Sequence, residues 1–367
     1  MAVAVKTDYI KSPRIDLGTM SDHVSAADEL QRGWPVVLAC FGTAVLAWGL
    51  GAYGQSVFLA ELQRAHGWSA SLVGAATTTL FLLGAVALPF VGQAIERFGP
   101  RAVLSSGALA MVLGAIGLGR VSTPWQLFAC NALMGLGWAG SSSAAIAATL
   151  ALWFDARRGF AIGLALCGAS AGGFVIAPLL VALSARWGFP NAVLVVAGTL
   201  GVILLPLILC TVHGESAPRR RGAPSPGADS NKTVIRSQAE GVRSGHVWSL
   251  ALPFALGIAA QVGFIVHQVA FLLPRLGPAR TSAALAAGSI AALGGRLGLA
   301  PIMGRLEQRR AGALVFLTQA AGLTLMLAWP DAVAALYLGS ILFGLGVGSL
   351  ILLPALITQR EFAPESF

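Results

Sequence analysis

The 367-residue chain is 56% hydrophobic and only 11% charged, with a mean hydropathy of +0.77. Soluble globular domains carry roughly 25% charged residues, so this composition excludes a soluble globular protein. The net charge of +9 at pH 7 would suit a protein that binds nucleic acid, unless the basic residues have another explanation.

The apolar residues form blocks long enough to cross a bilayer, which takes about 20 residues per helix. The polar first 33 residues contain no pattern of a cleavable signal peptide, so we expect the first apolar block to act as an uncleaved insertion signal. Ten spans are predicted, at about 34–59, 70–92, 101–119, 125–150, 159–184, 190–212, 247–273, 282–303, 311–329 and 332–357.

The basic residues are distributed unevenly between the two sides of this membrane. With the N-terminus inside, the outer side holds only Arg64, Arg120, Arg186, Arg275 and Arg280, and Arg296 lies within a span. Every other Lys and Arg falls in the cytoplasmic tail, turns or linker, as the positive-inside rule requires. The charge therefore reports topology and not a nucleic-acid partner. We expect a multi-pass protein of the inner (plasma) membrane with a cytoplasmic N-terminus.

The four cysteines lie in apolar spans with no paired spacing, which favours small buried side chains over a metal site or a redox centre. The histidines are scattered, and only His267 lies in a span, so no cluster suggests an intramembrane enzyme. We therefore expect no metal, no cofactor and no enzymatic activity.

The chain contains a weak internal repeat. The charged turn GQAIERFGPRAV, which begins at Gly92, is echoed by GRLEQRRAGALV, which begins 212 residues later at Gly304. The segments MGLGWAG and FGLGVGS, from Met134 and Phe343, repeat at the similar offset of 209. Tandem halves of this kind are typical of one class of transporters.

A polar segment rich in Pro and Ser separates the two copies and predicts a flexible linker. The expected organisation is a cytoplasmic tail over 1–33, a six-span half over 34–212, a cytoplasmic linker over 213–246 and an incomplete half of four spans over 247–367.

The first charged turn resembles the loop between spans two and three of the major facilitator superfamily of secondary transporters. That loop reads Gly-x-x-x-Asp-[Arg/Lys]-x-Gly-x-[Arg/Lys], and the matching residues here, with Glu in place of Asp, are Gly92, Glu96, Arg97, Gly99 and Arg101. The second copy retains Gly304 but not the acidic–basic order. Within the superfamily the chain looks most like the monocarboxylate and oxalate/formate branch, through segments such as RGWPVV, HGWSASLVG and RRGFAIGLALCGASAGG.

The resemblance implies an all-α membrane protein of two tandem six-helix halves with twelve spans, of which this chain has about ten. Phe154 aligns with Phe362 at an offset of 208, which would place the start of the eleventh span near residue 367. We therefore expect a C-terminally truncated chain that lacks the last two helices.

The function implied is secondary active transport of a small organic anion, monocarboxylate- or oxalate-like, by alternating access. The expected partners are that anion, the lipid bilayer and a coupling ion or counter-substrate, and the protein is expected to be a monomer. The alternative is a truncated, transport-defective or regulatory membrane protein that retains the fold.

Arg296 is the leading candidate for substrate binding, because it is the only charged residue deep inside a span. In the resembling branch an arginine in a Gly-Arg pair of span eight contacts the substrate carboxylate, and Gly295-Arg296 matches that pair. A guanidinium also holds a carboxylate through two parallel hydrogen bonds. The alternative is an arginine that reaches back to the cytoplasmic surface.

Polar residues in spans one and seven are further candidates for substrate binding. His267, Gln268 and Gln261 interrupt span seven, and Tyr53 and Gln55 interrupt span one. Each either faces a cavity, where it would contact substrate, or forms hydrogen bonds between helices without a ligand.

Glu96 and Arg97 are predicted to act in gating, since a carboxylate at this turn can pair in one conformation and be released in the other. The superfamily supplies that partner partly from the start of span eleven. The alternative is a solvated pair in a loop.

The coupling mechanism stays open. All Asp and Glu residues lie in loops, tails or span ends, and Ala292 stands where the monocarboxylate carriers have an aspartate. The lysine of span one in that family has no counterpart either. Proton symport is thus disfavoured, which leaves antiport, uniport or protonation at His267.

Overall fold

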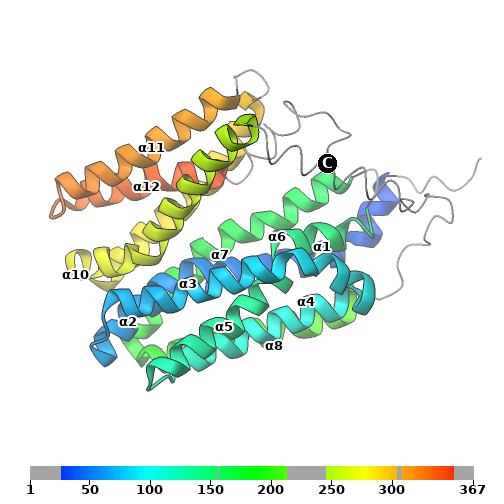
Figure 1. Cartoon of the computed structure of the whole chain (residues 1–367), viewed down its shortest axis with the longest axis horizontal. Coiled ribbons are helices and arrows are strands. Elements are labelled where there is room, and N and C mark those ends of the chain that lie inside the picture. The colour runs from blue at the N-terminus through cyan, green and yellow to red at the C-terminus, as the bar shows by residue number, and fades with distance from the viewer. Residues whose placement is uncertain (1–25, 155–156, 213–244, 304–307, 351–367) are drawn as a thin grey trace, which may run out of the picture.

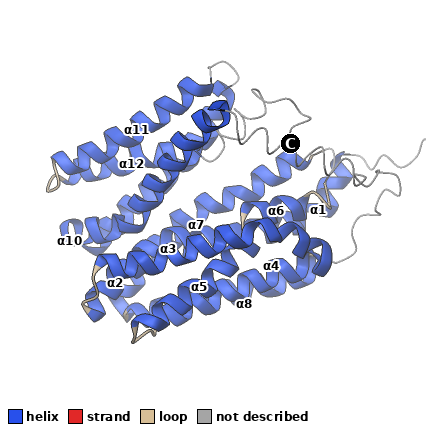
Figure 2. Ribbon diagram, viewed as in Figure 1, coloured by secondary structure: helices blue, strands red, loops and turns tan. Residues whose placement is uncertain are grey.

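The computed structural model describes residues 26–154, 157–212, 245–303 and 308–350. Within these ranges all regular secondary structure is helical (Figure 2). Helices suit a chain of this composition, because each peptide group finds its hydrogen-bond partner within the same segment and none is left unsatisfied in hydrocarbon.

Six apolar segments make up the first half. The first combines three elements without a break: α1 (Ala26–Leu46), the π-helix η2 (Ala47–Tyr53) and α2 (Gly54–His66). α3 (Ala70–Ala87), the 3₁₀ turn η3 (Leu88–Phe90) and α4 (Val91–Leu118) run on without a loop and together form the second and third segments, which are divided at Gly99 within α4. The remaining three are α5 (Pro124–Gly140) with α6 (Ser143–Leu150), α7 (Arg158–Trp187) and α8 (Phe189–Thr211).

The second half is formed by α10 (Gly245–Met303), α11 (Gln308–Ala328) and α12 (Val333–Leu350). The predicted linker falls on residues outside those described, between the end of α8 and the start of α10. The predicted cytoplasmic tail lies largely outside them as well, although α1 begins eight residues before the expected start of span one.

Two of these apolar stretches are too long for a single crossing. Ala70–Leu118 has 49 residues and Leu252–Gly295 has 44; as one helix, 49 residues would extend about 74 Å, far more than the hydrocarbon thickness of about 30 Å. Each contains one glycine with positive φ, Gly99 at 82° and Gly277 at 71°, where the helix is interrupted. A proline follows each glycine and suits the first turn of the next helix.

With these two interruptions, the described ranges hold ten apolar segments, which confirms the predicted all-α polytopic fold. The main difference from the prediction is at the C-terminal end of span one, which the charge distribution predicts to be outside. The helix continues to His66, so Glu61 lies within α2, where it is buried and 2.6 Å from the Arg64 guanidinium. Because Arg64 lies one turn away on the same helix, the ion pair forms within α2 and compensates the charge of the buried Glu61 carboxylate.

Glycines bring the helices into direct backbone contact. A Cβ atom on Gly168 would meet the Phe41 carbonyl of α1, and one on Gly172 would lie 2.6 Å from the Val45 carbonyl oxygen. In the second half, a Cβ on Gly344 of α12 would meet the Gly288 carbonyl of α10. Because lipid gives apolar helices no hydrophobic reason to associate, such close packing supplies much of the attraction between them.

The two halves lie close together at one end and diverge toward the other (Figure 1). Contacts between the halves are made by α10 with α2, η2 and α7, and the Ser282 hydroxyl of α10 donates to the Pro178 carbonyl of α7 over 3.2 Å. The α2 end, which the charge distribution assigns to the outside, is therefore the closed one.

Gly172→Ala is expected to lower the unfolding free energy by about 1–3 kcal/mol, the usual cost of overpacking, because α7 must move away from α1. Gly163→Ala on the same helix is the matched control, since a Cβ there has no atom within 4 Å. It should be neutral or stabilising by up to about 1 kcal/mol, as Ala favours helix. Thermal unfolding in detergent measures both, and equal midpoints would contradict the close approach of α7 to α1.

Candidate functional site

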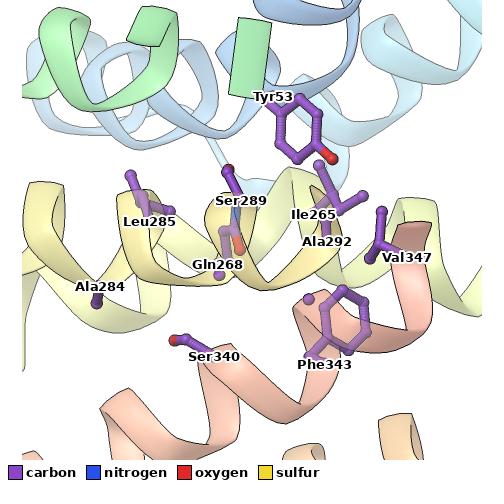
Figure 3. Close-up of a pocket in the computed structure, with 12 residues that line it drawn as sticks. Tyr53, Ile265, Gln268, Ala284, Leu285, Ser289, Ala292, Ser340, Phe343 and Val347 are labelled. Carbon is purple, nitrogen blue, oxygen red and sulfur yellow. The ribbon is translucent and has the colours of Figure 1, made fainter. Parts of the chain in front are cut away.

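The interface between the halves contains two adjoining cavities, both on the α10 face that meets span one. The first, here called the tyrosine cavity, is bordered by Tyr53 of η2, by Gln268 and Ser289 of α10 and by Ser340 of α12; the rest of its lining is apolar or glycine. Figure 3 shows the Tyr53 ring directed toward the α10 side chains, with Ser340 and Phe343 approaching from α12. The space open to the centre of a water-sized sphere is about 20 Å³, which suits about one water molecule.

The second cavity, here called the tryptophan cavity, lies between η2, α3, α5 and α10. The same measure gives about 170 Å³. Ile265 lines both cavities, so they are neighbours. The lining of the tryptophan cavity consists of Trp48, Ala52, Phe81, Trp138, Ile258, Gln261, Val262, Ile265 and Val266.

The π-helix explains how span one reaches both cavities. Trp48 and Tyr53 are five residues apart, which in an α-helix would place them about 140° apart around the axis. In η2 the hydrogen bonds instead join residues five apart, as in the bond from the Gly54 amide to the Gly49 carbonyl. Residues five apart therefore lie nearly above one another. As a result, one short segment contributes a side chain to each cavity.

Gln261 is held by a partner that the sequence analysis did not identify. The Nε2 of Gln319, on α11, donates to the Oε1 of Gln261 over 3.1 Å, and both side chains are buried. The sequence signal that could have identified Gln319 as a polar contact inside the membrane is its position as an amide residue within an apolar span. Its pairing with a residue 58 positions away depends on the packing of α11 against α10 and cannot be inferred from the sequence.

The remaining predicted binding residues lie in different surroundings. Tyr53 and Gln268 border the tyrosine cavity and Gln261 the tryptophan cavity. Gln55 lines neither of the two. It is buried within the first half, where its amide accepts from the Thr77 hydroxyl over 3.3 Å and lies 3.9 Å from the Met134 sulfur.

His267 is exposed on α10, and its Nδ1 lies 2.8 Å from the Gly263 carbonyl oxygen. Since a carbonyl only accepts, the proton of this bond belongs to Nδ1. Arg296 lies on α10, but its side chain is outside the described residues. By position it is four residues after Ala292, which borders the tyrosine cavity, so the two positions share a face of the helix.

The charged turn is built around Gly99. Its φ of 82° and ψ of 157° end one helix, and the buried Pro100 begins the next. Gly92, Glu96 and Arg101 are exposed, and the Arg97 guanidinium lies 5.2 Å from the centre of the Phe98 ring. Within the described ranges Glu96 forms no ion pair. The motif therefore sets a tight reversal of the chain direction and leaves its charged side chains exposed.

Substitutions in the glutamine pair should have unequal effects. Gln261→Leu leaves Gln319 buried without its partner and should cost about 1–2 kcal/mol of unfolding free energy. Gln319→Leu should cost less, because Gln261 borders a cavity in which water can replace the lost bond. The double variant should be more stable than Gln261→Leu alone. Thermal unfolding in detergent tests this order, and additive losses would contradict the pairing.

Comparisons with known proteins agree with this architecture. Residues 39–366 match the Major Facilitator Superfamily. Monocarboxylate transporter 13 of Bos taurus is 31% identical over 186 residues, which cover 48% of this chain and 43% of the relative. Monocarboxylate transporter 11 of Homo sapiens is 33% identical over 186 residues, covering 48% and 39%. The chain thus spans less than half the length of these curated relatives.

Two solved transporters share the fold. The nucleoside transporter NupG, in a mutant form, superimposes with a TM-score of 0.70 at 13% identity and covers 90% of this chain and 84% of its own. A bacterial homolog of the human lysosomal transporter Spinster, inward-facing and unoccupied, gives 0.65 at 14% identity, covering 92% and 76%. The family match shows that the chain belongs to the Major Facilitator Superfamily, its apolar segments make it a multi-pass membrane protein, and over part of its length it is similar to monocarboxylate transporters.

Proposed function

We propose that this protein carries a small organic anion, monocarboxylate- or oxalate-like, across the membrane by alternating access between its two halves. The observation that carries the proposal is the pair of adjoining cavities at the interface of the halves, of which the tyrosine cavity is partly polar; the halves are in contact at one end and diverge toward the other. A binding site at such an interface is exposed to one side at a time when the halves rock.

Arg296 supplies the positive charge in this proposal. One turn beyond Ala292, it lies at a position on the cavity face of α10. Gln268, Ser289 and Tyr53 add polar groups that orient a carboxylate, while Ile265 and Phe343 exclude water from its apolar part. The similarity to monocarboxylate transporters supports the same class of substrate.

Arg296→Ala should reduce uptake of the transported acid into proteoliposomes about 10- to 100-fold, because a hydrogen-bonded charge of this kind contributes about 1.5–3 kcal/mol. Arg296→Lys should retain an intermediate rate, since an ammonium keeps the charge but not the bidentate geometry. Arg186→Ala, at the exposed end of α7, is the control and should transport normally.

The experiment uses labelled lactate, oxalate and formate in turn. Stimulation of uptake by unlabelled acid loaded inside the vesicles would identify exchange with a counter-substrate. Uptake that is unchanged in Arg296→Ala would exclude its assigned role, and absence of uptake of all three acids would contradict the proposed substrate class.

The gating role proposed for the charged turn rests on its geometry. Glu96 and Arg97 follow one another on the last turn before Gly99 and are exposed. The start of α4, which carries them, lies at the end where the halves diverge (Figure 1). A carboxylate in that position can pair with the second half only when the two halves approach each other.

We further propose that the turn at Gly99 faces the cytoplasm and that Gly67 faces the outside of the inner membrane. In a background without the native cysteines, a single cysteine can replace the exposed Ala65, on the last turn of α2 just before Gly67, or Gly92, where an added Cβ has no atom within 4 Å. An impermeant maleimide should label Ala65→Cys in intact cells and Gly92→Cys only after permeabilisation. The reverse pattern would contradict this orientation.

A further inference from the structure

We infer that the tryptophan cavity binds an aromatic ring of the substrate, so that among organic anions the protein prefers an aryl-substituted monocarboxylate to one as small as lactate or oxalate. This inference rests on the proposed function and specifies its substrate class. Four features of the cavity support it: its size, the placement of its aromatic rings, the glycines that make room for them and its lack of charge.

The size of the cavity matches a single ring. Its volume of about 170 Å³ is close to that of an apolar protein cavity of about 150 Å³ that takes up benzene. The neighbouring tyrosine cavity, at about 20 Å³, has room for about one water molecule. A two- or three-carbon acid would leave most of the apolar volume unfilled.

The walls offer the geometry that aromatic rings prefer. Trp48 and Trp138 are edge-on with centroids 5.4 Å apart and an interplanar angle of 61°. Phe81 meets Trp138 edge-on as well, at 5.7 Å and 78°. These values lie within the favourable range for aromatic pairs, so a further ring in the cavity can join the cluster in the same edge-to-face manner.

Two glycines make room for the Trp138 indole. A Cβ on Gly51 of η2 would lie 2.6 Å from an atom of this ring, and one on Gly84 of α3 would lie 2.9 Å from it. Any other residue at either position would force the indole to move. The wall of the cavity thus depends on two elements, η2 and α3, that leave space for the Trp138 side chain of a third, α5.

The polarity of the cavity defines which part of a substrate fits there. Among its described lining residues none is charged, and the polar groups are the Gln261 amide and the indole N–H donors of Trp48 and Trp138. The Gln261 Oε1 already accepts from Gln319, which leaves the Nε2 hydrogens to donate. Such a site accepts a neutral aromatic ring, and it disfavours a bare carboxylate because an unpaired charge is costly to bury.

The carboxylate of the same molecule would lie in the adjoining tyrosine cavity. Ile265 borders both cavities, and η2 contributes Trp48 to one and Tyr53 to the other. An acid whose ring occupies the tryptophan cavity therefore has its carboxylate toward Gln268, Ser289 and the face of α10 that carries Arg296.

The test measures binding by calorimetry to the full chain in nanodiscs, with empty nanodiscs as the blank. Phenylacetate, cyclohexylacetate and acetate share one carboxylate and differ only in the attached group, and phenyltrimethylammonium keeps the ring but reverses the charge. Phenylacetate should bind at least about tenfold more tightly than acetate, because it buries a ring, and more tightly than cyclohexylacetate.

Two variants test the location of the ring. Trp138→Leu should weaken phenylacetate binding about 2- to 12-fold, the contribution of one edge-to-face pair, and leave acetate binding unchanged. Gly84→Ala should act in the same direction by displacing the indole. Gly74→Ala, on the same helix and with no atom within 4 Å of the added Cβ, should bind phenylacetate like the unmodified protein. Thermal unfolding of each variant confirms that it is folded.

The outcomes separate the two proposals. Equal affinities for acetate and phenylacetate, or tighter binding of phenyltrimethylammonium than of phenylacetate, would overturn the inference; uptake of small acids that depends on Arg296 would still support the proposed function. Unchanged phenylacetate affinity in both Trp138→Leu and Gly84→Ala would place the ring elsewhere and also overturn the inference. Absence of binding and uptake for every organic anion tested would overturn both.

Discussion

The peptide group has no water to bond with in the hydrocarbon core of a bilayer, and this constraint shapes the whole chain. It imposes helices throughout the membrane and makes any irregular backbone costly unless protein surrounds it. The π-helix η2 is such a place, and it lies at mid-span where nearly all of its residues are buried. Because it is enclosed by the first half and by α10, its altered hydrogen bonding is tolerated, and it turns two side chains toward the interface.

The second determinant is the distance at which helices pack. Without a hydrophobic force between helices in lipid, association depends on van der Waals contact, and glycine gives the closest approach. Gly168 and Gly172 serve this purpose between α7 and α1, while Gly51 and Gly84 admit the Trp138 ring. Glycine therefore allows close helix packing in one place and shapes a cavity in another. The two roles differ only in whether the group that contacts the glycine is the backbone of another helix or the Trp138 ring.

This dependence on neighbours decides what could be predicted from the sequence. The ten spans follow from local composition, and the reversal at Gly99 follows from a glycine before a proline. Gln55 and Gln261 look alike in the sequence, since each is an amide in an apolar span. The structure places Gln55 against Thr77 and Met134, and Gln261 at the tryptophan cavity. Their different surroundings come from the rotation of each helix about its axis, which long-range packing sets.

The extension of α2 to His66 is another feature that the hydropathy of the sequence does not predict, although it depends on residues only one turn apart. A charged residue at the end of an apolar block predicts the end of a span, yet Glu61 continues the helix because Arg64 pairs with it one turn later. The buried Glu61 carboxylate lies at the closed end of the interface, on the helix that contacts α10. Hydropathy alone registers the charge but not the pair that neutralises it.

The closed end is held in a way that allows it to open. The Ser282 hydroxyl lies 3.2 Å from the Pro178 carbonyl of the opposite half and 3.0 Å from the Pro278 carbonyl of its own helix. If the halves separate here, the hydroxyl keeps its partner on α10, so the polar cost of separation is small compared with leaving a buried donor unpaired. The apolar contacts around it are non-directional and can be exchanged for lipid or substrate. The hydrogen bond thus links the halves without locking them, which is compatible with the rocking motion that the proposed transport requires.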